Sequence, residues 1–356
     1  MRTIWILGAT GKGGRAIACE LAAVDGVDVV LVGRHHGRLT TVAESLGGTV
    51  GTQMAPGLTE LVTLIGAEKP AVVVNTIGPF GVTTIPLARA CIAAGSHYVD
   101  LANELEPVRE LLDLDADARS QGVTLVTGAG FGVLATETLV IGLRGDRPAA
   151  ESARVAALPA VDGMGSAVLA SVIDAVAHGG RRYRDGHLVR TRLGADHARI
   201  PLPDLPARDV LAVPTGELEA AQRASGASSV LAYSGEVPSG RMARALLPAV
   251  SALLAVRPIR AVLQRFVSRM RLSPPVKAGE VSWAYARLEW AGGTHREAWL
   301  RTGEGYGFTA KVAAHTAARI SNGAAEAGAF TPGALFGTDL ARDACAEIIT
   351  PDGVTR

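Results

Sequence analysis

The sequence predicts an α/β protein: a doubly wound parallel sheet, followed by a second domain of α+β type. Three observations support this fold class. A buried apolar strand at residues 4–7 runs directly into a glycine-rich turn and a helical pattern. Short apolar runs then alternate with helical patterns as far as about residue 145, as expected for parallel strands joined by helices. Beyond the Asp-Arg-Pro at 146–148 this alternation becomes irregular.

The first strand leads into GATGKGG at residues 8–14 and a helical pattern at 15–22. Glycines allow the backbone to turn sharply and to approach a pyrophosphate, whose charge the N–H groups at the helix start can hold. The spacing Gly-x-x-Gly-x-x-Gly differs by one residue from the usual dinucleotide motif. An ordinary glycine-rich turn is the alternative. We expect a nucleotide cofactor here, bound by Gly8, Ala9, Thr10, Gly11, Lys12, Gly13 and Gly14.

The second strand, residues 28–32, ends at Gly33 and Arg34 without an acidic residue. An acidic side chain at this position binds the ribose hydroxyls of NAD, whereas arginine suits the 2′-phosphate of NADP. We therefore expect NADP(H), with Arg34 as the main contact and Arg38 as a second. Solvated arginines are the alternative interpretation.

Four more strands are expected in this half, at 49–53, 71–76, 97–101 and 123–126, of which the one at 71–76 is buried. Helices are expected at 38–46, 58–65, 84–94 and 107–121. Ligands of open parallel sheets bind beyond the carboxyl ends of the strands. The loops that follow the fourth and sixth strands should therefore line the cofactor site, with a plain loop as the alternative. The residues concerned are Asn75, Thr76, Gly78, Pro79, Phe80, Gly130 and Phe131.

Together these motifs resemble those of the saccharopine dehydrogenase-like oxidoreductases. The similarity is strongest to a bacterial branch that includes trans-acting enoyl reductases of lipid and polyketide assembly, and it loosens after residue 145. The resemblance implies a Rossmann-type domain, NADP(H) and a homodimer. The segments that carry it are GATGKGG at 8–14, Gly33-Arg34, NTIGPF at 75–80, AGSHYVDLANE at 94–104 and GAGFGV at 128–133.

Two departures from the family pattern bear on function. Lys12 and Gly13 stand where the family commonly has Tyr-Thr. After Phe131, residues 132–137 read GVLATE, where many relatives have Asp-Ser-x-Pro-Ser-Asp. The second departure removes a carboxylate near the expected substrate site, which argues against aminated substrates such as saccharopine.

The candidates for protonating a reduced product are Tyr98 and Asp100, near the carboxyl end of the fifth strand. Strand alternation puts both on one face and His97 on the other. A packed tyrosine and a helix-capping aspartate are the alternative interpretation.

We expect three regions: an NADP-binding domain at 1–145, a substrate and dimerisation domain at 146–302, and a C-terminal helix and tail at 303–356 that packs back toward the first domain. The second half should contain a glycine turn and a helix ending at His178, a hairpin at 180–193 and a proline-rich loop at 201–206. Further elements are expected at 151–161, 209–213, 217–224, 228–233, 279–290, 294–301 and 303–320.

The segment 242–266 is strongly apolar and is interrupted by prolines and arginines. Three interpretations remain open for it: a packed helical hairpin, a lid over a hydrophobic ligand, or a helix lying in a membrane interface.

Composition limits the other possibilities. The chain has 356 residues and a net charge of +1, so no general attraction to nucleic acid or to an anionic membrane is expected. Its three cysteines are far apart and form no metal-binding pattern, so no metal site is expected. Without a secretory signal or a long apolar run, a cytoplasmic protein with no membrane span is expected.

The predicted function is NADPH-dependent reduction of a C=C (enoyl) or C=N bond in a bulky, largely apolar metabolite, including one bound to a carrier protein. A saccharopine-type amino-acid dehydrogenase or imine reductase is the first alternative, for which Arg181, Arg182 and Arg184 form the visible charged cluster. A non-catalytic NADP-binding or lipid-associated protein is the second.

Overall fold

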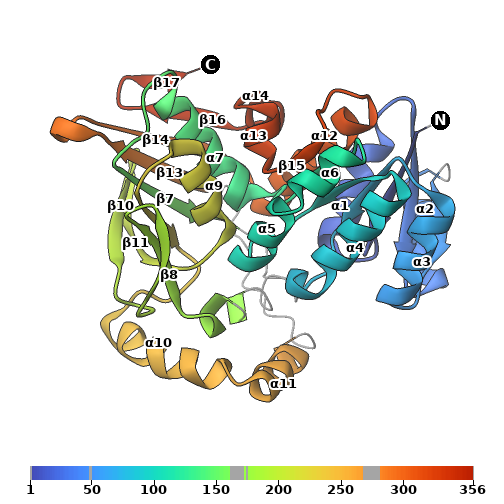
Figure 1. The fold of residues 1–356 in the computed structure, drawn as a ribbon, viewed down its shortest axis with the longest axis horizontal. Helices are drawn as coiled ribbons and strands as arrows, with labels where there is room; N and C mark the ends of the chain where they lie inside the picture. The colour runs from blue at the N-terminus through green and yellow to red at the C-terminus, as the bar shows by residue number, and fades with distance from the viewer. Residues whose placement is uncertain (1, 48–49, 161–171, 174, 268–280, 356) are drawn as a thin grey trace. The chain divides into compact units, whose positions relative to one another are not determined.

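The structure is a computed structural model that describes residues 2–47, 50–160, 172–173, 175–267 and 281–355 (Figure 1). The chain forms two compact units. Unit 1 comprises Met1–Ala102, Glu106–Gly130 and Tyr306–Phe336. Unit 2 comprises Asn103–Leu105, Phe131–Gly305 and Gly337–Arg356.

Unit 1 is built on a seven-stranded, all-parallel sheet in the order β15-β6-β5-β4-β1-β2-β3. The order β3-β2-β1-β4-β5-β6 is that of the doubly wound dinucleotide-binding fold, so the predicted fold class is confirmed. The strands are β1 (Arg2–Leu7), β2 (Val27–Gly33), β3 (Gly51–Met54), β4 (Val72–Asn75), β5 (His97–Asp100), β6 (Thr124–Val126) and β15 (Gly328–Phe330).

Helices α1 to α6 follow the strands of unit 1, and α12 and α13 come from the C-terminal part of the chain (Figure 1). The helix expected at 107–121 is two helices. Leu114 lies between them and is buried in the main core, and the acidic first turn of α6 suits a new helix N-terminus. The bounds are α1 (Lys12–Ala22), α2 (His36–Ser45), α3 (Leu58–Glu68), α4 (Phe80–Ala94), α5 (Leu105–Leu112), α6 (Asp115–Ser120), α12 (Gly305–Ser321) and α13 (Pro332–Phe336).

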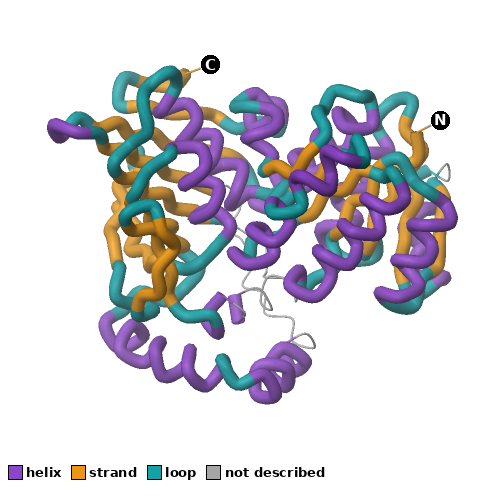
Figure 2. The backbone as a smooth tube through the Cα atoms, in the orientation of Figure 1, coloured by secondary structure: helices purple, strands orange, loops and turns teal. Residues whose placement is uncertain are grey.

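Unit 2 is built on a ten-stranded sheet, whose strands are orange in Figure 2. The sheet is largely antiparallel, with one parallel pair between β12 and β7. Trp283, Tyr285 and Trp299 form its aromatic core together with apolar residues of β10 and β11. The strands are β7 (Ser152–Leu158), β8 (Gly180–Arg184), β9 (His187–Thr191), β10 (His197–Leu202), β11 (Leu205–Ala212), β12 (Ser229–Ser234), β13 (Ser282–Glu289), β14 (His295–Thr302), β16 (Glu347–Thr350) and β17 (Gly353–Thr355).

Both hairpins expected in unit 2 are present: β8–β9, and β13–β14 joined by the short 3-10 turn η1 (Ala291–Gly293). The proline-rich loop expected at 201–206 is wrong. Strand β10 continues to Leu202 and β11 begins at Leu205, because the turn between them has Asp204 in the left-handed region (φ 57°). Pro201 is tolerated because β10 lies at the edge of the sheet, where a missing N–H does no harm. Most of the helix expected to end at His178 lies outside the described residues.

Helices α7 (Phe131–Arg144) and α9 (Gly216–Ser225) pack on each other and on the sheet of unit 2. The remaining helices of this unit are α10 (Arg241–Leu254), α11 (Arg257–Val267) and α14 (Asp339–Asp343). The compact units group α7 with the second sheet, whereas the expected division falls after residue 145. Compact units and domains need not coincide, so the domain boundaries stay a prediction. None of the helices in the described ranges is long and apolar enough to cross a membrane.

Candidate functional site

The glycine turn after β1 has the geometry of a nucleotide-binding turn, and two of its glycines are required by the fold itself. Gly8 has a positive φ of 79°, and a Cβ there would lie 2.8 Å from Thr76 Oγ1. A Cβ on Gly14 would lie 2.5 Å from the carbonyl oxygen of Gly8. Neither position has room for a side chain, so strand, turn and helix α1 can pack this closely only with glycine.

Gly13 differs, because a Cβ there would meet its nearest atom, Leu101 Cδ1, at an ordinary contact distance of 3.8 Å. The packing of the chain therefore does not require glycine at this position, whereas close approach of a ligand would. Gly11 is the N-cap of α1, makes no side-chain cap, and is followed by a first turn without acidic residues. The helix N-terminus thus offers uncapped positive charge to an anion. These features fit a dinucleotide pyrophosphate.

Arg34 directly follows β2, and Arg38 lies in the first turn of α2. Both side chains are exposed, and neither has an ion-pair partner among the described residues. Their position and charge fit a 2′-phosphate, as expected for NADP(H). In the first part of α1, Arg15 Nε donates to the carbonyl oxygen of Thr10 at 3.0 Å, and this hydrogen bond stabilises the glycine turn.

The end of β4 is fixed by hydrogen bonds of the buried Asn75. Its amide nitrogen donates to Tyr98 Oη at 3.0 Å and to Thr83 Oγ1 at 3.2 Å, and its oxygen accepts from the Ile77 N–H at 3.0 Å. Thr76 Oγ1 donates to the carbonyl oxygen of Leu7 at 2.7 Å. Asn75 and Thr76 therefore hold the β4–α4 loop against the glycine turn.

Asp100 is fully buried at the end of β5 and accepts five hydrogen bonds. Its Oδ2 accepts from Thr84 and Tyr98, and its Oδ1 accepts from the Thr127 hydroxyl and from two backbone N–H groups. Burial raises the pKa of Asp100, and the hydrogen bonds from Thr84, Thr127 and the two backbone N–H groups oppose the shift. The carboxylate thus ties together the ends of β5 and β6.

Tyr98 and Asp100 lie on the same face of β5, as expected, and are joined at 3.1 Å. Burial and the nearby Asp100 raise the pKa of Tyr98 well above its ordinary value. Both side chains have no exposed surface, so this geometry accounts for a structural role. The catalytic role stays a prediction. His97, on the other face, accepts the Thr124 N–H at 2.9 Å.

Some of the remaining residues predicted to line the cofactor site lie in loops, and others are buried in the core. Pro79 follows a cis peptide bond and caps α4. Phe80 is buried with Ala102 and two apolar residues of α5, so its ring serves a core cluster. Gly130 follows β6 in unit 1. Phe131 is buried and begins α7 in unit 2.

Helix α12 contributes residues that the sequence did not indicate for the site. Lys12 Nζ lies 4.2 Å from the ring centroid of Tyr306, a cation–π contact. A Cβ on Gly130 would lie 3.4 Å from Thr309 Cγ2. The start of α12 therefore lies beside the glycine turn and the loop after β6. The run of glycines at 303–307 was the available signal for this helix start.

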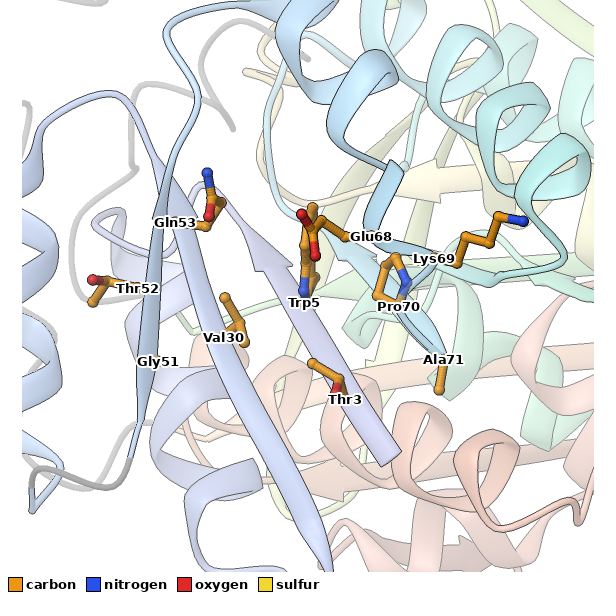
Figure 3. A pocket seen from close by; sticks show the side chains of 10 residues that line it. All are labelled: Thr3, Trp5, Val30, Gly51, Thr52, Gln53, Glu68, Lys69, Pro70 and Ala71. Atoms are coloured by element: carbon orange, nitrogen blue, oxygen red, sulfur yellow. The ribbon is translucent and has the colours of Figure 1, made fainter. Parts of the chain in front are cut away.

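A hollow of about 440 Å³ lies along β1, β2 and β3, toward their amino ends (Figure 3). Thr3, Trp5, Val30, Gln53 and Pro70 are among its lining residues. Because ligands of this fold bind at the carboxyl ends of the strands, the hollow is not the cofactor site.

Unit 2 contains a buried acidic residue, Glu217, that the sequence analysis did not single out. Asn103 Nδ2 donates to Glu217 Oε1 at 3.3 Å, across 114 positions of sequence. Asn103 Oδ1 and Glu217 Oε2 are buried and have no hydrogen-bond partner among the described residues. Gly132 leaves room for this carboxylate, since a Cβ there would collide with Glu217 Oε1.

Glu217 and Glu236 influence each other electrostatically. Burial raises the pKa of Glu217, and hydrogen bonds from Thr215, from its own backbone N–H and from Asn103 oppose the shift. Burial, with a smaller effect of the Glu217 charge, raises the pKa of Glu236 to about 7. A carboxyl that titrates near neutrality can donate a proton under physiological conditions. Within the described ranges, no group of three or more His, Cys, Asp or Glu is arranged to hold a metal ion.

Comparison with known proteins agrees with this geometry. Residues 4–126 match the saccharopine dehydrogenase NADP binding domain. A Mycobacterium tuberculosis protein named, provisionally, as a trans-acting enoyl reductase is 29% identical over 223 residues, which cover 58% of this chain and 53% of that protein. A trans-acting enoyl reductase of Mycobacterium ulcerans is 32% identical over 137 residues, 36% of this chain and 32% of that protein. The chain thus spans about half the length of the first relative and about a third of the length of the second.

Two solved structures resemble nearly the whole chain in fold. Saccharopine dehydrogenase (L-Glu forming) of Saccharomyces cerevisiae superposes with a TM-score of 0.60 at 13% identity and covers 97% of this chain and 96% of its own. An amine dehydrogenase of Mycobacterium smegmatis superposes with a TM-score of 0.50 at 15% identity, covering 94% and 96%. The resemblance predicted from the motifs is confirmed over residues 4–126, which match the saccharopine dehydrogenase NADP-binding domain.

Proposed function

We propose that the protein is an NADPH-dependent reductase that transfers a hydride to a C=C bond of a bulky, largely apolar acyl substrate. The observation that carries this proposal is the glycine turn: Gly13 is open to a ligand and Arg34 lies uncovered at the adjacent strand end. The names of the similar proteins support the enoyl substrate class. A carrier-bound form of the substrate and a homodimer are parts of the proposal.

The chain's own residues would act by binding and orientation. The N-terminus of α1 holds the pyrophosphate, and Arg34 and Arg38 hold the 2′-phosphate. Asn75 and Thr76 fix the loop beside the turn, so that the cofactor surface is preformed. Bound NADPH supplies the hydride. The proton that completes the reduction would come from a side chain or from water.

Cofactor choice is tested by titrating the purified protein with NADPH and with NADH. Arg34→Ala should weaken NADPH binding about tenfold or more, since it removes a charge-assisted contact, and should change NADH binding little. Arg199→Ala, an exposed arginine of β10, is the matched control. Equal losses for both cofactors would refute the 2′-phosphate contact, and no binding of either would refute the reductase.

Reduction of a C=N bond is the second candidate, because one observation favours it. The buried Glu217 and the half-buried Glu236 interact electrostatically, and two acceptor oxygens beside them, Glu217 Oε2 and Asn103 Oδ1, are unpartnered among the described residues. Such a group suits a cationic amine or iminium. Glu217→Gln should then abolish turnover of imine substrates with NADPH binding intact. If enoyl turnover is present and Glu217→Gln leaves it unchanged, the first candidate is supported.

A further inference from the structure

Helices α10 and α11 of unit 2 expose an unusually apolar surface, which we name the α10–α11 face. It consists of the exposed large apolar residues Met242, Leu246, Val250, Leu253, Val256, Ile259, Val262, Leu263 and Phe266. Soluble proteins rarely expose so many neighbouring apolar side chains without a partner.

The apolar residues of each helix form one stripe. In α10, Met242, Leu246, Val250 and Leu253 recur at helical spacing, and Met242 is 80% exposed. In α11, Ile259, Val262, Leu263 and Phe266 do the same, with Val262 66% and Phe266 62% exposed. Both helices are therefore amphipathic, with the apolar stripe turned to solvent.

The stripe on α10 is not the face by which the helix is attached. Leu254 is buried in a cluster with Val176 and Leu193, against which Leu247 also packs. Internal packing thus accounts for one side of α10 and leaves the α10–α11 face uncovered. The helices run one after the other along the lower edge of this unit in Figure 1.

The charge of the two helices is of one sign. Helices α10 and α11 contain five arginines and no acidic residue. Arg241, at the start of α10, is exposed. The aliphatic stripe suits a hydrocarbon layer and the cationic charge suits an anionic surface. Anionic phospholipid offers both at once.

We propose that the α10–α11 face lies in the interface of an anionic phospholipid membrane, with the apolar stripe at the acyl boundary and the exposed Arg241 at the headgroups. Arginine stems can extend along the apolar layer while their guanidinium groups reach the phosphates. The attachment is peripheral. It would hold the protein where long apolar substrates are found, but it does not depend on the proposed reductase activity.

The test is co-sedimentation of the full-length protein with phosphatidylcholine vesicles, with and without phosphatidylglycerol. Binding should require phosphatidylglycerol and weaken as salt is raised. The double variant Val262→Gln/Phe266→Gln should bind at least about tenfold more weakly, because it removes two large apolar contacts. Leu205→Gln, an equally conservative change at an exposed leucine of β11, should bind like the parent protein.

A second double variant, Met242→Gln/Leu246→Gln, changes the stripe on α10 and should also weaken binding, so the result does not depend on correct folding of α11 alone. The thermal unfolding temperature of both double variants should equal that of the parent protein. Failure to bind either kind of vesicle would overturn the proposal, and so would equal binding of all the variants. Concentration-dependent dimerisation that Val262→Gln/Phe266→Gln abolishes, without vesicle binding, would assign the face to a second copy. Capture of an acidic carrier protein without vesicle binding would assign it to that partner.

Discussion

Two buried carboxylates, Asp100 in unit 1 and Glu217 in unit 2, differ in how fully their oxygens are used. Asp100 accepts five hydrogen bonds, so both of its oxygens are occupied by the protein. Glu217 receives a long hydrogen bond from Asn103 at Oε1. Its weaker contacts with Thr215 and with its own backbone N–H leave Oε2 without a well-formed hydrogen bond among the described residues. Burial raises the pKa of both side chains.

This difference distinguishes a carboxylate buried to stabilise the fold from one buried to bind a ligand. A saturated carboxylate stabilises the strands around it and has nothing left to offer a ligand. An unsaturated one costs stability, because an unpaired buried acceptor loses its hydration. Such a cost is tolerated at sites where a ligand completes the hydrogen bonding. We therefore infer that Asp100 maintains the sheet edge and that Glu217 is available to a substrate.

The largest expected effect is on stability at Asp100. Asp100→Ala leaves two backbone N–H groups and the Thr84 and Thr127 hydroxyls without their acceptor. We expect the free energy of unfolding in urea to fall by about 3 kcal/mol or more. Glu110→Ala, at an exposed acidic residue of α5, is the control and should change it little. A loss below about 1 kcal/mol at Asp100 would contradict the structural role.

The next largest effect is the pH dependence that comes from Glu236. Its pKa in the folded protein is about 7, above the ordinary 4.5, so between these pH values the folded state binds more protons than the unfolded state. The contribution of Glu236 to the free energy of unfolding should therefore be complete below pH 4.5 and be lost as pH rises to 7, a loss of up to about 3 kcal/mol. Unfolding of Glu236→Gln over the same range isolates this contribution. If Glu236→Gln and the parent protein have the same dependence of stability on pH, the pKa of Glu236 is not raised.

Sequence reasoning was most successful where the signal is local. Short stretches of sequence identify the glycine turn, the end of β2 and the alternation of six strands with helices. These features predicted the correct fold. Alternation also put Tyr98 and Asp100 on one face of β5. It carries no information about depth, because complete burial of these side chains depends on the helices and strands packed around them.

The features that sequence reasoning missed depend on contacts between distant segments. Asn103 and Glu217 are 114 positions apart, and no pattern in either segment indicates the other. Strand β15 and the Lys12–Tyr306 contact depend on a chain that returns to unit 1 after building unit 2. The strands at residues 201–206 were predicted to be a proline-rich loop, because proline usually interrupts strands, whereas edge strands tolerate it.

Tyr98→Phe tests the donor side of the Asp100 network. The change removes one of the five donors to Asp100 and one acceptor of Asn75, so we expect a loss of about 1 kcal/mol in the free energy of unfolding. Turnover with NADPH should stay within a factor of a few if the tyrosine is structural. A fall of about 100-fold or more in kcat, with cofactor binding intact, would instead support the proton-donor role predicted from the sequence.

The smallest effect on stability is expected at Glu217, and it is the sharpest test of the comparison. Glu217→Gln removes a buried charge and keeps an oxygen that can accept from Asn103, so the free energy of unfolding should change by less than about 1 kcal/mol or rise. Loss of the negative charge should also lower the pKa of Glu236, which would flatten the pH profile of stability. A loss as large as that of Asp100→Ala would mean that Glu217 is as structural as Asp100. A small change in stability together with loss of imine turnover would instead identify an acidic residue kept for its substrate.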